Sequence, residues 1–142
     1  MTATRPGPSP LSIEPIGDGY VPGVCNIGPW EARRRWAFGI LGLAAAALLA
    51  GALIALHAPV AARALVLLPA WGGAFSVLQA RRRFCGAYAI GRRSNFGSTY
   101  GTVRRVEDEA AHAVDMAALR RMLRDSFVVA LALTVLAAAV PL

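Results

Sequence analysis

The sequence predicts an all-α integral membrane protein, and two observations point to this class. Hydrophobic residues make up 56% of the 142 residues and charged residues only 16%, against roughly 45–50% and about 25% in soluble proteins. The apolar residues also gather in three long runs, at about residues 36–56, 62–80 and 126–142. This composition weighs against a soluble enzyme and excludes a chain that is disordered throughout.

The first two runs predict an antiparallel transmembrane hairpin. Residues 36–56 carry no charge and would reach roughly 31 Å as a helix, which is about the thickness of the hydrocarbon core. The loop at residues 57–59 is short, so the second run must return beside the first. We expect Arg63 at the outer interface, because a charge at the bilayer centre costs about 2.5–3.5 kcal/mol or more. Pro69 and the Gly72–Gly73 pair predict a kink near the middle of the second span.

A cytoplasmic amphipathic helix is predicted to lead into the third span. Apolar residues recur at helical spacing over residues 107–124. Acidic residues start this segment and arginines end it, which matches the helix macrodipole. The helix either runs on into residues 126–142 or breaks near Ser126, which can act as an N-cap. The third run spans the membrane, or alternatively lies in the interface or packs on the hairpin.

The arginines predict the orientation. All 15 basic residues are arginine, and only Arg63 falls on the far side of the predicted hairpin. By the positive-inside rule, the N-terminus and residues 81–125 are cytoplasmic and the C-terminus lies outside a bacterial inner membrane. This topology explains the net charge of +7 without nucleic acid as a partner. The arginines that we assign to topology or lipid headgroups are Arg33, Arg34, Arg35, Arg81, Arg82, Arg83, Arg92 and Arg93.

The remaining segments divide the chain into a tail and one membrane domain. Proline is concentrated in the first 30 residues, and proline interrupts helices. We therefore expect residues 1–20 to be a disordered tail and residues 21–142 to form a single membrane domain. Residues 84–105 carry regularly spaced glycines that disfavour a stable helix. We expect this link to lie against the membrane surface.

Small residues in the first span predict close helix packing. They recur every four residues, a spacing that allows two membrane helices to approach closely. The facing helix would be the second span or a partner subunit. The residues concerned are Gly39, Gly42, Ala46, Ala47, Ala50 and Gly51.

Two groups of residues can carry chemistry. Cys25 and Cys85 both fall at the cytoplasmic face in this topology, so they can form a thiol pair or, with His112, part of a metal site. The alternatives are two unrelated reduced thiols or lipidation. Glu109 and His112 have the spacing used in di-iron bundles, but the motif occurs once and no acid lies in a span. We therefore interpret Glu109, His112 and Asp115 as a solvated helix start.

These patterns lead to three functional hypotheses. The first is a non-enzymatic accessory, assembly or scaffolding subunit, which binds the lipid bilayer and a membrane-protein partner or a second copy of itself. The second is a thiol or metal module at the cytoplasmic face. The third is an adaptor that binds anionic lipid through Arg92, Arg93, Arg104 and Arg105. No nucleophile–base set or phosphate loop occurs in the sequence, so we lean against an enzyme and expect no cofactor.

Overall fold

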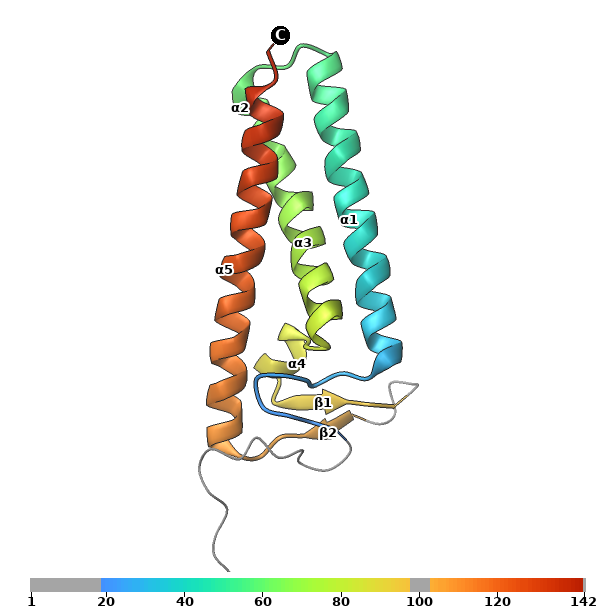
Figure 1. Cartoon of the computed structure of the whole chain (residues 1–142), viewed down its shortest axis with the longest axis vertical. Helices are drawn as coiled ribbons and strands as arrows, with labels where there is room; N and C mark the ends of the chain where they lie inside the picture. Colours follow the sequence, from blue (N-terminus) through green and yellow to red (C-terminus); the bar gives the residue numbers. More distant parts are fainter. Residues whose placement is uncertain (1–18, 98–102, 142) are drawn as a thin grey trace, which may run out of the picture.

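Three long helices dominate the computed structural model, which describes residues 19–97 and 103–141. They are α1 (Pro29–Ala55), α3 (Leu67–Arg82) and α5 (Glu109–Ala139), and α3 packs against both of the others (Figure 1). Each is long and apolar enough to span a membrane when α3 is counted with the short turns before it. The expected membrane-helix architecture is confirmed at this level.

Short elements lie at both ends of the bundle. At the end marked by the C-terminus in Figure 1, α2 (Val60–Arg63) and the 3-10 turn η1 (Ala64–Val66) connect α1 to α3. At the opposite end lie α4 (Gly86–Ile90) and a two-stranded sheet of β1 (Arg93–Asn95) and β2 (Val103–Arg105). Most of the arginines belong to this end, so we name it the arginine-rich end.

The amphipathic segment and the third span form one helix. α5 continues through Asp125 and Ser126 without a break. The Ser126 hydroxyl does not cap a new helix, because it donates to the Leu123 carbonyl at 3.0 Å. It also accepts a bond from the Trp71 indole at 3.1 Å, which fixes α3 to α5. The true N-cap is Asp108, whose carboxylate accepts from the Ala110 amide at 2.9 Å.

The irregular part of the second span lies close to Pro69. α3 runs as one helix through Pro69, Gly72 and Gly73, and the 3-10 turn η1 comes directly before it. Proline has no amide hydrogen for the carbonyl four residues earlier, and that residue is Leu65, in the middle of η1. The 3-10 turn therefore lies where Pro69 removes a helix bond, whereas the Gly72–Gly73 pair does not interrupt α3.

The two helices of the hairpin, α1 and α3, are each followed by a residue in the left-handed region of backbone conformation. His57 after α1 has φ 53°, and Arg83 after α3 has φ 49°. The amides of His57 and Ala58 donate to the carbonyls of Ile54 and Leu53, as in a Schellman motif. Arg83 and the residue after it close α3 in the same way.

Glycines allow α1 and α3 to touch along their backbones. A Cβ atom at Gly73 would lie 2.7 Å from the Leu43 amide nitrogen and 2.9 Å from the Gly42 carbonyl carbon. A Cβ atom at Gly39 would lie 2.6 Å from a Val77 methyl carbon. The facing helix for this part of α1 is thus the second span.

The Gly73→Ala substitution should separate the two helices. We expect a loss of about 1–3 kcal/mol in the free energy of unfolding, because backbone atoms must move to admit the methyl group. Gly72→Ala is the matched control, since a Cβ atom there meets nothing within 4 Å. It should be neutral or stabilise by about 0.5–1 kcal/mol through helix propensity. Unfolding in detergent would compare the two variants, and equal stability would contradict the close contact.

Arg63 lies at one end of the bundle, and its side chain is buried against α5. Its side chain is 1% exposed and reaches the last turn of α5. It donates to the Val140 carbonyl at 2.8 Å and the Ala137 carbonyl at 3.2 Å, and its Nε donates to Ala58 at 3.3 Å. The guanidinium therefore caps the negative end of the α5 dipole and ties the hairpin loop to the third span.

The glycine-rich link contains a short helix, although we expected its glycines to disfavour a stable helix. Residues 86–90 form α4, and residues 93–95 and 103–105 pair as an antiparallel ladder. Two of the glycines lie at the ends of α4, where they do not interrupt it: Gly86 is its first residue and Gly91 its C-cap. Residues 1–18 of the predicted tail and residues 98–102 of the predicted link lie outside the described residues.

Candidate functional site

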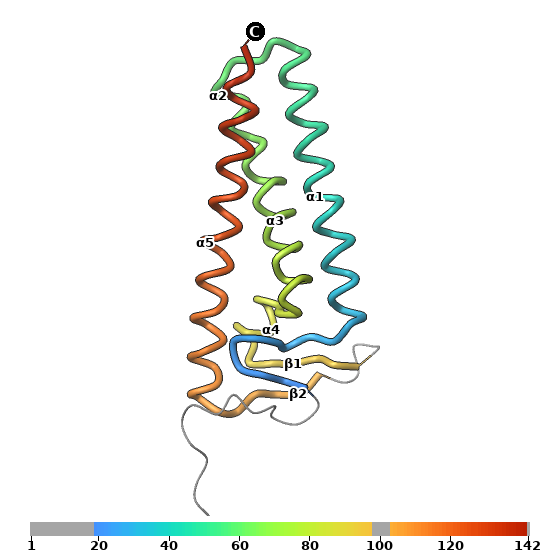
Figure 2. The backbone as a smooth tube through the Cα atoms, in the orientation of Figure 1, coloured from blue at the N-terminus to red at the C-terminus, as the bar shows by residue number. Residues whose placement is uncertain are grey.

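The N-terminal segment 19–28 runs beneath the helices at the arginine-rich end (Figure 2). The Asn26 and Ile27 amides donate to the Arg83 carbonyl at 3.0 and 3.1 Å. The Gly28 amide donates to Asn95 at 2.7 Å, and the Asn95 amide donates back to Asn26 at 2.9 Å. We call this segment, together with α4, β1, β2 and the first turns of α5, the platform.

Asn26 joins the segment to the turn after α3. Its side chain is fully buried, accepts from the Cys85 amide at 2.6 Å and donates to the Cys85 carbonyl at 3.0 Å. The amide thus satisfies both polar backbone groups of a residue that is itself fully buried. Since unpaired buried backbone groups are costly, Asn26 fixes the position of the segment.

Asp115 joins the same segment to α5. Its carboxylate is 2% exposed and accepts from the Tyr20 hydroxyl at 2.7 Å and the Gly23 amide at 2.6 Å. Burial raises the pKa of Asp115, and burial together with the bond to Asp115 raises the pKa of Tyr20. The interpretation of Asp115 as part of a solvated helix start was therefore wrong. Tyr20, which the sequence assigned to the tail, belongs to the folded domain.

The Asp115 pair predicts a specific pH dependence. Because the folded state raises the pKa of Asp115, it holds the proton more tightly than the unfolded state does. This contribution to stability is complete below the ordinary pKa of about 3.9 and is lost as the pH rises through the folded value. We expect thermal unfolding of Asp115→Asn to show a smaller fall with rising pH than the wild type. Parallel curves for the two proteins would contradict this assignment.

The two cysteines flank Asn26 but their sulfur atoms have different partners. Cys85 is fully buried, and its sulfur accepts from an Arg35 nitrogen at 3.1 Å. Cys25 is half-buried and its thiol lies 3.7 Å from the Ile27 carbonyl oxygen. Burial raises the pKa of Cys25, which disfavours its thiolate. Both cysteines are free thiols.

His112 lies on α5, near the Asp115 carboxylate rather than in a cluster with the cysteines. Over residues 19–97 and 103–141, no group of three or more His, Cys, Asp or Glu side chains is placed to hold a metal ion. The thiol or metal hypothesis remains a prediction based on the two cysteines alone.

Several of the arginines that we assigned to membrane topology or lipid headgroups form ion pairs with acidic side chains. Glu31, 3% exposed, binds Arg34 at 3.2 Å and Arg35 at 3.1 Å. Arg82 reaches Asp125 at 3.5 Å. Arg92 binds Glu109 through two nitrogens, at 2.8 and 3.1 Å, and these bonds lower the pKa of the Glu109 carboxyl. Arg33, Arg81 and Arg83 are exposed at the same end.

The comparisons with known proteins give no further direction. No protein-family model, curated protein or solved structure matches this chain. The site must therefore be interpreted from its own geometry.

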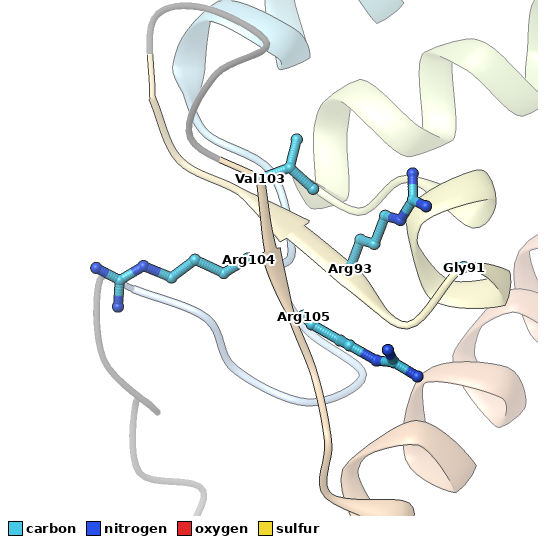
Figure 3. Close-up of a pocket in the computed structure, with 5 residues that line it drawn as sticks. All are labelled: Gly91, Arg93, Val103, Arg104 and Arg105. Atoms are coloured by element: carbon cyan, nitrogen blue, oxygen red, sulfur yellow. The ribbon is translucent and has the colours of Figure 1, made fainter.

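A basic cavity of about 480 Å³ lies beside the two-stranded β1–β2 hairpin (Figure 3). It is lined by Gly91, Arg93, Val103, Arg104 and Arg105. We expected Arg93, Arg104 and Arg105 to bind lipid, but the ladder that sets Arg93 opposite Arg105 was not predicted. The proline-rich composition also concealed the role of Asn26 and Tyr20, whose partners lie 59 and 95 residues away.

The predicted packing residues of α1 divide into two groups. Gly39, Gly42, Ala46 and Ala50 face α3 or the core beside it. Ala47 and Gly51 are exposed, and a Cβ atom at Gly51 would meet nothing within 4 Å. A step of four residues turns an α-helix by about 40° beyond a full turn, so a row that starts on α3 at Gly39 rotates away from it by Gly51.

Proposed function

We propose that this chain is a small non-enzymatic scaffolding or accessory subunit of a membrane complex. The platform carries this proposal, because it joins the ends of all three long helices through bonds from one N-terminal segment. Its buried polar side chains, Asn26, Glu31 and Asp115, are engaged in these bonds or in salt bridges beside them. Such an arrangement favours a rigid support over a site that exchanges a substrate.

We further propose that a transmembrane helix of a partner protein packs on the outer face of α1. Ala47, Gly51 and Ala55 are exposed there, and small residues allow a second helix to approach closely. The platform also supports this proposal, because it holds α1, and with it the outer face of α1, in a fixed direction.

Site-specific crosslinking tests this proposal. A diazirine-bearing leucine analogue at Leu48, which is 77% exposed, should form a stoichiometric protein adduct in native membranes. The same analogue at Leu136, 66% exposed on α5, is the matched control and should label lipid. Gly51→Leu should abolish the adduct at Leu48, whereas Gly72→Leu should not, although both glycines face open space.

The outcomes separate the candidate partners. An adduct of twice the chain mass would identify a second copy of this chain as the occupant and replace the hetero-complex. Lipid adducts alone at both positions would overturn the proposal that α1 carries an interface.

We also propose that the arginine-rich end faces the cytoplasm of a bacterial cell, as the positive-inside rule requires. With Cys25 and Cys85 changed to serine, a membrane-impermeant maleimide should label His57→Cys in intact cells. Ala87→Cys, which is exposed on α4 at the other end, should react only after permeabilisation. The reverse pattern would invert the orientation.

A further inference from the structure

The β1–β2 ladder places two arginines directly opposite each other. Arg93 pairs with Arg105 in the antiparallel register, so their side chains leave the same face of the hairpin. In Figure 3 both side chains extend toward the side on which Gly91 lies, and Arg104 extends the other way. Both are exposed. Like charges at opposed positions destabilise a ladder, so the pair needs an explanation beyond folding.

Neighbouring acids do not neutralise this pair in the part of the chain that the structure describes. Arg92, Arg82 and Arg34 each have a carboxylate partner within 4 Å, whereas neither Arg93 nor Arg105 has one. Of the adjacent acids, Glu109 binds Arg92 and Asp108 caps α5, and the exposed Glu107 forms no ion pair within 4 Å with Arg93 or Arg105. Two positive charges therefore face the same space without a negative charge between them.

The space they face is large enough for a ligand. The cavity measures about 480 Å³, within the usual range of about 300–1,000 Å³ for ligand pockets. Gly91 lines the cavity beside Arg93, and a Cβ atom there would be in ordinary contact with the Arg93 Cδ atom, at 3.6 Å.

We propose that Arg93 and Arg105 together bind a phosphate group at this cavity. Guanidinium groups bind phosphate oxygens through paired, charge-assisted hydrogen bonds. The phosphate comes from an anionic lipid headgroup or from a small phosphorylated solute. The strands β1 and β2 that line the cavity lie at the arginine-rich end of the bundle, where either source can reach it. This inference does not depend on the scaffolding function.

Native mass spectrometry of the full chain in mild detergent tests the lipid source. We expect phosphatidylglycerol to bind more tightly than phosphatidylcholine, and the double variant Arg93→Gln/Arg105→Gln to weaken this binding about tenfold or more. The matched control is Arg120→Gln/Arg121→Gln, which removes the same charge from exposed positions on α5. It should change the affinity less than about threefold.

The solute source is tested with the protein in phosphatidylcholine nanodiscs. Inorganic phosphate or glycerol phosphate at millimolar concentration should raise the melting temperature of the wild type, and the rise should vanish in the Arg93/Arg105 variant. Without phosphate, the variant should melt at or above the wild-type temperature, because it removes the repulsion between opposed charges. This comparison also shows that the variant is folded.

Each outcome of these two experiments either assigns the source of the phosphate or overturns the proposal. Selective loss of lipid binding assigns the site to a headgroup, and selective loss of the phosphate response assigns it to a solute. Equal loss in both double variants would reduce the binding to general charge attraction and overturn the proposal. Binding that neither variant changes would overturn it as well.

Discussion

Replacing Asn26 by alanine should loosen the N-terminal segment from the bundle and cost about 1–3 kcal/mol of stability. The substitution removes the acceptor of the buried Cys85 amide, at 2.6 Å, and one of the two donors to the Cys85 carbonyl, at 3.0 Å, whereas the Ala89 amide still donates to that carbonyl. A buried donor or acceptor left without a partner costs about 1–3 kcal/mol. Alanine cannot restore either bond, and the site has no exposed surface through which bulk water could do so.

Hydrogen exchange measures this effect most directly. In Asn26→Ala the amides of Ile27, Gly28 and Asn95 should exchange faster, since the segment carries their bonds. The amides in the middle of α1 and α3 should keep their protection. Cys25→Ala is the control, because it removes only a weak contact of 3.7 Å from the neighbouring residue. If both variants lost the same protection, Asn26 would not be the residue that fixes the segment.

The second large effect is expected at Arg63, at the opposite end of the bundle. Arg63→Met keeps the length of the side chain but removes its donors to the carbonyls of Ala58, Ala137 and Val140. Hydrogen bonds from a charged group contribute about 1.5–3 kcal/mol each. We expect a loss of about 3 kcal/mol or more, because the last turn of α5 then has unpaired carbonyls beside apolar surface.

Arg63→Lys tests whether the positive charge alone stabilises the end of α5 or whether the shape of the guanidinium is also needed. A lysine keeps the positive charge at the negative end of the helix dipole but lacks the fork that reaches several carbonyls at once. Its stability should fall between those of the wild type and Arg63→Met. Fraying of residues 135–141, followed by spin labels at Val135, is the local measurement. A fully stable Arg63→Met protein with an ordered last turn would contradict the capping role.

The sequence predicted the helices because hydrophobic length and charge are local properties. Residues 36–56 and 126–142 are recognisable without knowledge of any partner, and α1 contains residues 36–55 and α5 residues 126–139 of these runs. The role of Gly73 was not predicted, because glycine in a sequence reports a local preference only. Gly73 allows the close contact with Gly42 on the facing helix.

The platform could not be predicted for a related reason. A proline-rich stretch has the composition of a tail, and nothing near Asn26 along the chain indicates that its partner is the backbone of Cys85. The position of Asp115 in the sequence is typical of a solvated helix face, and only the structure shows that Tyr20 covers it. The Arg93–Arg105 pair depends on the register of β1 against β2. Strands of three residues are too short for their hydrophobic pattern to specify this register.

The arrangement of the platform has a consequence for biosynthesis. The segment that carries Tyr20, Gly23 and Asn26 leaves the ribosome before α1, α3 and α5, yet its partners lie 95, 92 and 59 residues later in the chain. At about 5–20 residues per second, this segment must wait several seconds for Cys85 and longer for Asp115. In the proposed topology, the platform can close only after α1 and α3 have returned the chain to the starting side of the membrane. A chain inserted with the wrong number of crossings would leave this segment without partners, so closure of the platform reports correct insertion.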